Sequence, residues 1–224
     1  VYAEPLAEFV IGSCIYFAKD FPRLLKNQKS SSWESFESEL VSGKTLGIFG
    51  YGEIGRSIAK KASALGMNVI AVRRRKELSA NDPYLKEVYS FNEADKIFSS
   101  SDYLVSAAPL TDETKGFINK SLLTKMKSSS VFLNVGRGPV VLEEDLIEIL
   151  QAKKIKGAAL DVFEVEPLNI DSPLWKMDNV LISPHIADRN TGWLEKSMQC
   201  FIDNCKRFIR GEELQNVVDI EKGY

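Results

Sequence analysis

A glycine-rich stretch between two apolar runs constrains the fold of this chain more than any other feature of its sequence. Residues 45–75 read TLGIFGYGEIGRSIAKKASALGMNVIAVRRR. The first apolar run is typical of a short buried strand, and Gly50, Gly52 and Gly55 follow it with the spacing G-x-G-x-x-G. Apolar residues at helical intervals then lead to a second apolar run at 67–72. The pattern predicts a strand, a tight turn, a helix and a second strand.

This unit predicts a seat for a phosphate group. Gly50 permits the tight turn, and Gly52 lets a pyrophosphate approach the backbone without meeting a Cβ atom. Gly55 lets the helix pack close to the strand. The helix that opens at Glu53 and Ile54 offers N–H groups and a partial positive charge to the anion. Glycines at turns are common, so the prediction of nucleotide binding depends on the strands and the helix around the motif.

The residues at the end of the second strand indicate which dinucleotide is bound. An NAD site usually has Asp or Glu here to hold the ribose 2′-hydroxyl, whereas this chain has Arg73, Arg74 and Arg75. A guanidinium group binds a 2′-phosphate through charge-assisted hydrogen bonds, and a carboxylate repels it. We therefore favour NADP(H) over NAD(H). The alternative is that the triplet is a solvated basic turn and the cofactor is NAD(H).

Composition excludes several classes of protein. The net charge of −2 argues against a nucleic-acid surface. The three cysteines, Cys14, Cys200 and Cys205, lack a C-x-x-C spacing, so we expect no disulfide framework and no metal site. The apolar run at 9–18 is too short to span a bilayer. We expect a protein of the reducing cytoplasm without a membrane partner.

The order of apolar segments predicts an α/β fold. Expected strands are 46–49, 67–72, 87–89, 103–107, 131–135, 156–162 and 180–183. Expected helices, besides the one after the glycines, are 3–19, 92–98, 121–127, 143–153 and 191–209. This alternation predicts a doubly wound parallel sheet of the Rossmann type, with ligands at the carboxyl ends of its strands.

The predicted segments divide the chain into three parts. Residues 1–30 hold a helix that is apolar on nearly every face, and its connection. Such a helix is either buried in a core or lies at a subunit interface, and we favour an interface in a homodimer. Residues 26–42 are polar and are expected to form a connecting loop. Residues 31–190 form the expected dinucleotide-binding domain, and residues 191–224 a terminal helix and tail.

Polar side chains follow three of the later strands, where ligands bind. Arg137 directly follows a buried strand, and Asp161 ends another, with Glu164 and Glu166 in the loop behind it. His185, the single histidine of the chain, follows a further strand. Taken singly, these residues are typical of a capping arginine, solvated carboxylates and a structural histidine. Together at one edge of a nucleotide-binding sheet, they fit a reductase of 2-oxo acids.

Such a reductase needs three kinds of group. A guanidinium group binds the substrate carboxylate and polarises the carbonyl, in a contact worth about 1.5–3 kcal/mol. An imidazolium donates a proton to the oxygen as hydride arrives, which contributes about 10²–10⁴ in rate. A neighbouring carboxylate holds the imidazole in one tautomer and favours its protonated form.

The sequence resembles the D-isomer-specific 2-hydroxyacid dehydrogenases in five blocks that follow in the family's order. They are GKTLGIFGYGEIGRSIA, DYLVSAAPLTDETKGFIN, KMKSSSVFLNVGRGPVV, KGAALDVFEVEPL and SPLWKMDNVLISPHIA. The resemblance implies that Arg137, Glu166 and His185 are catalytic, which leaves Glu164 as a bystander. It also implies that Asp161 and the backbone at 135–137 hold the nicotinamide carboxamide. Further residues implied to contact the cofactor are Val135, Gly136, Ala108, Pro109, Leu110 and Thr114.

The resemblance narrows the expected reaction. The triple arginine is similar to that of NADP-preferring glyoxylate and hydroxypyruvate reductases within the family. We expect reduction of a small 2-oxo acid, with glyoxylate or hydroxypyruvate favoured, to the 2-hydroxy acid. The alternatives are an NAD-linked 3-phosphoglycerate or other 2-hydroxyacid dehydrogenase, and a cofactor-sensing module similar to the family's corepressors.

The chain departs from the family pattern in three places. Ala107 stands where many members have a histidine, and Asp188, Arg189 and Asn190 follow PHIA where Gly and a small residue are usual. The resemblance also implies a substrate-binding domain, formed mostly by a segment that precedes the first helix. Because the sequence begins at Val1, we expect that domain to lie outside this chain, with the terminal tail returning towards it. The alternative is a stand-alone nucleotide-binding domain that cannot close a cleft over substrate.

Overall fold

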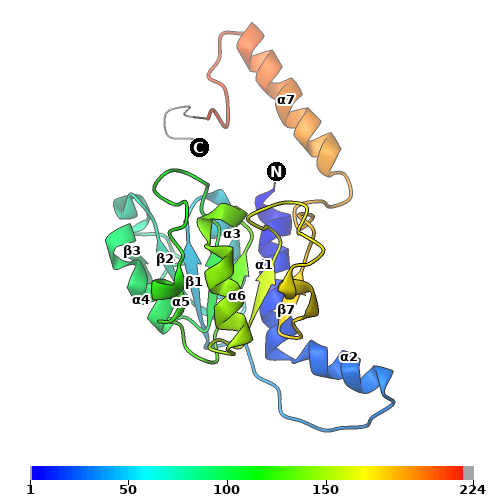
Figure 1. Ribbon diagram of the computed structural model, residues 1–224. Coiled ribbons are helices and arrows are strands. Elements are labelled where there is room, and N and C mark those ends of the chain that lie inside the picture. Colours follow the sequence, from blue (N-terminus) through cyan, green and yellow to red (C-terminus); the bar gives the residue numbers. More distant parts are fainter. Residues whose placement is uncertain (1, 219–224) are drawn as a thin grey trace.

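A seven-stranded parallel sheet forms the centre of the computed structural model, which describes residues 2–218 (Figure 1). The strand order is β3-β2-β1-β4-β5-β6-β7. The strands are β1 Thr45–Phe49, β2 Asn68–Val72, β3 Glu87–Tyr89, β4 Tyr103–Ser106, β5 Val131–Asn134, β6 Gly157–Leu160 and β7 Val180–Ile182. The predicted Rossmann-type parallel sheet is confirmed, and each expected strand is present, some of them shorter than expected.

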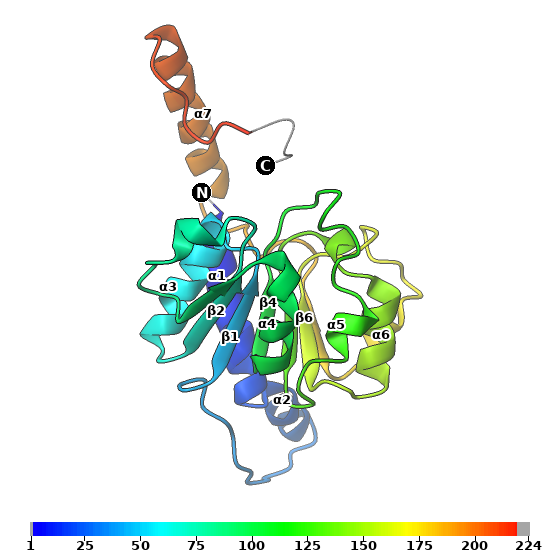
Figure 2. The same cartoon turned by 90° about the vertical axis from the view of Figure 1, so that its left-hand side faces the viewer.

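Helices cover both faces of the sheet (Figure 2). They are α1 Ala3–Ala18, α2 Phe21–Lys29, α3 Glu53–Ala64, α4 Ala94–Ser100, α5 Lys120–Leu123, α6 Glu143–Gln151 and α7 Trp193–Ile209. One core cluster lies between the sheet and α1 and α3, and the other lies between the sheet and α4, α5 and α6. Within β5, Val131 and Leu133 belong to the first cluster and Phe132 to the second. This alternation follows from the two-residue period of a strand.

The inner face of α1 belongs to the core. Leu6, Val10, Cys14 and Phe17 are buried against α3 and the sheet. The core explanation for its apolar sequence therefore holds for this face. On its outer side, Phe9, Ile11, Ile15 and Tyr16 are only partly buried, so the predicted subunit contact stays a prediction.

Two segments differ from the sequence-based expectation. Residues 26–29 were expected in a loop but form the last turn of α2. The side chain of Asp20 accepts a hydrogen bond from the backbone N–H of Arg23, and Pro22 occupies the first turn, which are ordinary signals for a helix start. The helix expected at 121–127 is short because the chain turns after Leu123 and buries Met126 in the core.

The helix α7 projects away from the sheet in both views (Figures 1 and 2). None of its residues is buried. Its large exposed apolar side chains are Leu194, Met198, Phe201, Ile202, Phe208 and Ile209. At about 100° per residue, positions 194, 198, 201, 202, 208 and 209 fall on one side of the helix and therefore form one stripe along it. A hydrogen bond of 3.1 Å between the hydroxyls of Tyr2 and Ser197 joins its first turns to the N-terminal end of α1.

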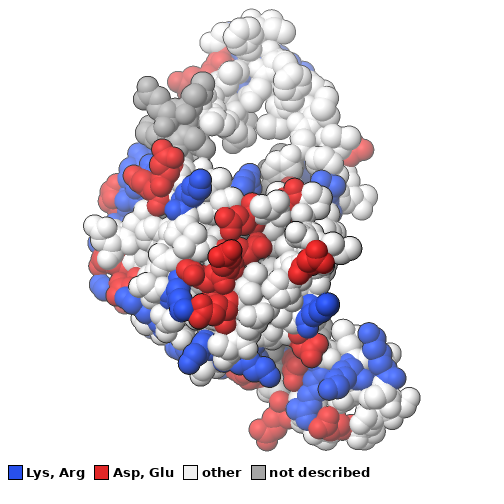
Figure 3. Space-filling model, in the orientation of Figure 1, with Lys and Arg blue, Asp and Glu red and all other residues white. Residues whose placement is uncertain are grey.

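Charges of both signs are spread over the surface seen in Figure 3. Acidic side chains gather where α6 lies, whose first turn carries Glu143, Glu144 and Asp145, and basic side chains gather on α2. Across residues 2–218, no helix combines the length and the apolar character needed to cross a membrane.

Candidate active site

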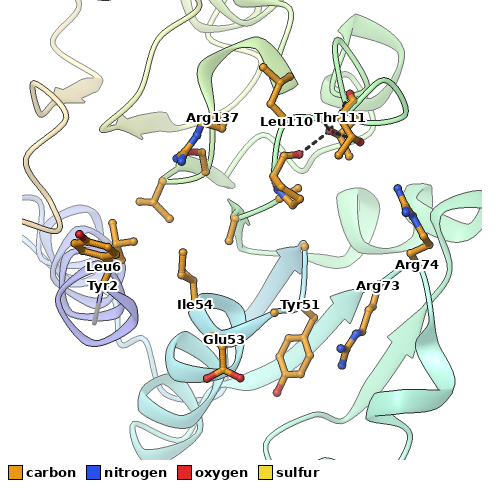
Figure 4. A pocket seen from close by; sticks show the side chains of 18 of the residues that line it. Tyr2, Leu6, Tyr51, Glu53, Ile54, Arg73, Arg74, Leu110, Thr111 and Arg137 are labelled. Atoms are coloured by element: carbon orange, nitrogen blue, oxygen red, sulfur yellow. Dashed lines mark hydrogen bonds between the residues drawn. The ribbon is translucent and has the colours of Figure 1, made fainter. Parts of the chain in front are cut away.

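A cavity of about 630 Å³ opens at the carboxyl ends of the strands. Its walls come from the segments that follow the seven strands, together with the first turn of α1 (Figure 4). β1 and β4 are neighbours in the sheet, and the strand order runs outward from them in both directions. Ligands of doubly wound folds bind at this point of reversal.

The glycine turn after β1 is built as its spacing requires. Gly50 has φ +97°, and a Cβ atom there would lie 2.5 Å from the backbone nitrogen of Ala108. A Cβ atom on Gly55 would lie 2.7 Å from the carbonyl oxygen of Gly50. Both positions therefore require glycine for the close approach of backbone segments.

Gly52 differs from Gly50 and Gly55, the other two glycines of the motif, because it faces open space. A Cβ atom at this position would have no heavy atom within 4 Å, and the residue lines the cavity. Gly52 also precedes the first turn of α3, whose N–H groups have no partner within the helix. In Figure 4 the Glu53 carboxylate points away from the side of the cavity to which Ile54 points. The space above Gly52 therefore fits a pyrophosphate group.

The three arginines after β2 line one end of the cavity. Arg73 donates from Nη1 to Oγ of Ser79 at 2.5 Å. Arg74 forms an ion pair with Glu113, with 2.7 Å between Nη2 and Oε2. Arg75 precedes a short 3-10 helix at Lys76–Ser79. This end of the cavity thus holds the basic charge that the sequence predicted there.

The loop after β4 forms the wall beside the arginines. Ala108, Pro109, Leu110 and Thr111 all line the cavity. The buried hydroxyl of Thr114 donates to the carbonyl oxygen of Pro109 at 2.6 Å and accepts from the N–H of Thr111 at 2.8 Å. The side chain of Thr114 therefore fixes the shape of this turn.

Arg137 follows β5 on the far side of the cavity from Arg74 (Figure 4). The N–H of Val135 donates to the carbonyl oxygen of Ser106 at 3.0 Å, and the N–H of Gly136 donates to Oδ1 of Asn134 at 3.2 Å. The Arg137 guanidinium donates from Nη1 to the carbonyl oxygen of Gly136 at 2.8 Å. Its remaining N–H groups are available to a ligand, since a guanidinium has more donors than this contact uses.

His185 and Glu166 come together although 19 positions separate them in the sequence. The imidazole Nδ1 lies 2.7 Å from Oε2 of Glu166. The other carboxylate oxygen of Glu166 accepts from the N–H of Phe163 at 3.0 Å. Because the contact uses Nδ1, the carboxylate fixes the imidazole with Nδ1 protonated and leaves Nε2 for other chemistry. His185 lines the cavity, and Glu166 lies behind it.

The charge state of Glu166 follows from its neighbours. Burial raises the pKa of the Glu166 carboxyl, but hydrogen bonds from His185 and from the N–H of Phe163, together with the charges of His185 and Arg137, outweigh it. The net pKa lies below the ordinary value. Glu166 is therefore an anion at neutral pH, and the positive charges near it are those of His185 and Arg137.

Asp161 is the buried anchor of the loop that carries His185. Its Oδ1 accepts from the hydroxyl of Ser183 at 2.5 Å and from the N–H groups of Ile186 and Ala187 at 3.0 and 3.1 Å. Asp161 also lines the cavity. Its carboxylate therefore fixes both sides of the histidine loop.

Comparison with known proteins places the chain in a family. Residues 11–187 match the sequence profile of the D-isomer specific 2-hydroxyacid dehydrogenase, NAD binding domain. This chain belongs to the D-isomer specific 2-hydroxyacid dehydrogenases. A glyoxylate/hydroxypyruvate reductase B from Enterobacter sp. is 39% identical over 180 residues, which are 80% of this chain and 55% of that protein. The chain thus matches little more than half the length of this curated relative.

Solved structures of 2-hydroxyacid dehydrogenases share the fold. An NADPH-dependent glyoxylate/hydroxypyruvate reductase from Sinorhizobium meliloti, in complex with NADP and sulfate, is 31% identical with a TM-score of 0.92. A probable 2-hydroxyacid dehydrogenase from Rhizobium etli, in complex with NADP, HEPES and tartaric acid, is 32% identical with a TM-score of 0.89. In each case the match covers 100% of this chain and 70% of the other.

Most residues predicted for the dehydrogenase site meet at the cavity. Those that line it are Gly50, Gly52, Glu53, Ile54, Arg73, Arg74, Arg75, Ala108, Pro109, Thr114, Val135, Gly136, Arg137, Asp161 and His185. Gly55 lies behind the turn and Glu166 behind the histidine. Within the part of the chain that the structure describes, no group of three or more His, Cys, Asp or Glu side chains is placed to hold a metal ion.

Sequence reasoning missed part of the wall. Tyr2 and Leu6 reach the cavity from α1, and Tyr51, Phe91 and Thr111 also line it. Ala107 and Asp188, two of the departures from the family pattern, line it as well. No local signal marks Tyr2 or Leu6, because their place depends on how α1 packs across α3. Tyr51 and Thr111 lie inside the family's sequence blocks, and this position is a signal that marks both as neighbours of the cofactor site.

Proposed function

We propose that this chain is the dinucleotide-binding and catalytic part of an NADP(H)-dependent reductase of small 2-oxo acids. The observation that carries the proposal is the contact of 2.7 Å between Nδ1 of His185 and Oε2 of Glu166 at the cavity that Arg137 also lines. The same cavity holds the glycine turn and the arginine triplet. A binding site for the cofactor and the parts for proton transfer therefore occur together.

The cofactor residues divide along the cavity. Gly52 and the N–H groups of α3 would hold the pyrophosphate, and the arginines would hold a 2′-phosphate. Asp161 and the backbone at Val135 and Gly136 would hold the nicotinamide end. Bound NADPH supplies the hydride. NADP is favoured over NAD because no carboxylate stands in the triplet after β2.

Arg137 is the proposed substrate anchor. Its guanidinium makes one hydrogen bond to its own backbone region and retains further donors for a carboxylate. A bidentate contact would orient a 2-oxo acid with its carbonyl group near His185. The electrostatic effect of Arg137 on Glu166 supports this proximity.

His185 is the proposed proton donor. With Nδ1 held by Glu166, the imidazolium presents Nε2–H towards a substrate oxygen. The anionic Glu166 stabilises the positive charge of the imidazolium before transfer. On oxidation of the 2-hydroxy acid, the neutral imidazole would take the proton back.

The proposal extends to the substrates, the cellular location, the oligomeric state and the division of the chain into parts. Glyoxylate and hydroxypyruvate are favoured because relatives at 31–39% identity bear those names. We propose a cytoplasmic homodimer that pairs through the outer apolar side of α1. We also propose the division into residues 1–30, 31–190 and 191–224. The exposed stripe of α7 would then pack against a substrate-binding domain.

Binding and turnover measured side by side test the proposal. We expect the chain to bind NADPH and to reduce glyoxylate, and we expect His185→Gln to abolish turnover while leaving the Kd for NADPH nearly unchanged. An equal loss of NADPH binding would show that the histidine is structural. Tight NADPH binding without reduction of glyoxylate or hydroxypyruvate, also when the proposed substrate-binding domain is supplied, would contradict the proposed activity.

A further inference from the structure

The ion pair between Arg74 and Glu113 joins two different walls of the cavity. Arg74 follows β2, and Glu113 belongs to the turn after β4. Nη2 of Arg74 lies 2.7 Å from Oε2 of Glu113. In Figure 4 the Arg74 side chain points towards the turn that holds Thr111. A carboxylate of this chain thus already contacts one of the guanidinium groups proposed to bind a 2′-phosphate.

The position of Glu113 is set by a rigid turn. The neighbouring Thr114 is buried, and its hydroxyl is bonded to the carbonyl oxygen of Pro109 and to the N–H of Thr111. The carbonyl oxygen of Thr111 further accepts from the N–H groups of Thr114 and Lys115 at 3.1 and 2.9 Å. These bonds hold the Glu113 backbone beside the arginines.

Arg73 and Arg74 contact partners of different charge. Arg73 contacts the hydroxyl of Ser79, which is uncharged. A hydroxyl can both donate and accept hydrogen bonds, so it does not repel a phosphate. Arg74 contacts an anion. A phosphate that approaches Arg74 must either displace the Glu113 carboxylate or lie beside it, and two anions repel each other at such distances.

We infer that Glu113 is a specificity-determining residue whose carboxylate competes with the ribose 2′-phosphate for Arg74. The inference rests on the proposed use of NADP(H). Glu113 weakens the binding of NADP(H), leaves the binding of NAD(H) almost unchanged, and thereby narrows the selectivity between the two. The Arg74 and Glu113 side chains are 37% and 60% exposed, so salt screens the competition.

Titration with both dinucleotides tests this inference. Glu113→Gln keeps the size of the side chain and removes its charge. We expect the Kd for NADPH to fall about threefold to tenfold, given the modest strength of an exposed ion pair and the added anion repulsion. The Kd for NADH should change by less than about a factor of two. The Kd for adenosine 2′,5′-bisphosphate should fall as the Kd for NADPH does. The Kd for 5′-AMP should change as little as the Kd for NADH.

Two matched variants separate competition from a general loss of charge. Asp112→Asn removes an equal charge from the same exposed turn and should leave the ratio of the two Kd values near that of the unmodified chain. In an Arg74→Met background, Glu113→Gln should lose most of its effect on NADPH. Both experiments use binding as the readout and do not depend on turnover.

The outcomes are distinct. An unchanged Kd for NADPH in Glu113→Gln, or an equal change for NADPH and NADH, would overturn the inference and leave the proposed function standing. An effect of Asp112→Asn as large as that of Glu113→Gln would also overturn it, since any nearby charge would then suffice. Failure of the unmodified chain to bind either dinucleotide would overturn the proposed function and this inference with it.

Discussion

The backbone N–H of His185 donates a hydrogen bond of 3.0 Å to the carbonyl oxygen of Asp161, the residue that follows β6. The carboxylate of the same aspartate binds the N–H groups of Ile186 and Ala187. The proposed proton donor is therefore positioned by a residue from the neighbouring strand. His185 itself has φ +54°, a left-handed conformation that these contacts hold in place.

Replacing Asp161 tests the importance of this anchor. Asp161→Ala leaves the hydroxyl of Ser183 and two backbone N–H groups without their acceptor in a buried site. We expect the free energy of unfolding to fall by about 2–5 kcal/mol, measured by urea denaturation. Ser183→Ala removes one of the same bonds and serves as the control, with an expected loss of about 1 kcal/mol. Equal losses in the two variants would refute the idea of a shared anchor.

Gly52→Ala should separate binding from stability. The added methyl group meets no atom of the protein within 4 Å, so the free energy of unfolding should change by less than about 1 kcal/mol. The methyl group would occupy the space proposed for the pyrophosphate, so the Kd for NADPH should rise about tenfold or more. Calorimetric titration of both proteins measures this. If Gly52→Ala binds NADPH as tightly as the unmodified chain, the pyrophosphate does not lie against Gly52.

Gly50→Ala should instead destabilise the fold. Its Cβ atom would lie 2.5 Å from the backbone nitrogen of Ala108, and φ is +97°. We expect a loss of about 3 kcal/mol or more in the free energy of unfolding. Gly43, with φ +79° and no heavy atom near a Cβ, is the matched control. Gly43→Ala should lose only about 1 kcal/mol, the contribution of strain alone. Similar losses at both positions would mean that the contact with Ala108 is unimportant.

The pH dependence of stability should reveal the ion pairs of Glu39. Hydrogen bonds from Lys44 and then Lys156 lower the pKa of Glu39 from its ordinary 4.5 to about 2. A depressed pKa means that the stabilisation is fully present above pH 4.5 and is lost as pH falls from there towards 2. Glu39→Gln should therefore lose about 1 kcal/mol at pH 7 and progressively less below pH 4.5. A difference that does not change with pH would contradict the assigned pKa.

Glu166→Gln should impair turnover without impairing cofactor binding. Glutamine retains a hydrogen-bond acceptor for Nδ1 of His185 but loses the negative charge that stabilises the imidazolium. We expect kcat for glyoxylate to fall about 10²-fold, with the Kd for NADPH within a factor of about two. Steady-state kinetics and fluorescence titration measure the two effects. Glu164→Gln is the control and should leave kcat unchanged, because the carboxylate that His185 contacts is that of Glu166.

Much of the fold could be predicted from the sequence because the central strands are buried on both faces. The runs around Leu46, Leu104 and Leu133 are apolar and short, and each became a strand. The glycine spacing and the loops after strands then placed Arg137 and His185 at one edge. Local patterns sufficed here, since a parallel sheet brings the ends of its strands together by construction.

The remaining features depend on packing between distant segments. Tyr2 lines the cavity because α1 crosses α3, and Glu113 reaches Arg74 because the turn at Thr114 has one particular shape. Neither contact can be predicted from the local sequence around Tyr2 or around Glu113. The start of α2 is different, because Asp20 and Pro22 are local signals for the start of a helix. The polar composition of residues 26–42 favoured a loop instead.

The bond between Asp161 and the histidine loop limits how this protein can be re-engineered. A loop transplanted from another enzyme in place of residues 183–187 would arrive without the acceptor that shapes it, since that acceptor belongs to the end of β6. A designer who wants a different histidine geometry must therefore exchange both segments at once. Asp161 and residues 183–187 must therefore be exchanged together, although about twenty residues of loop and strand lie between them.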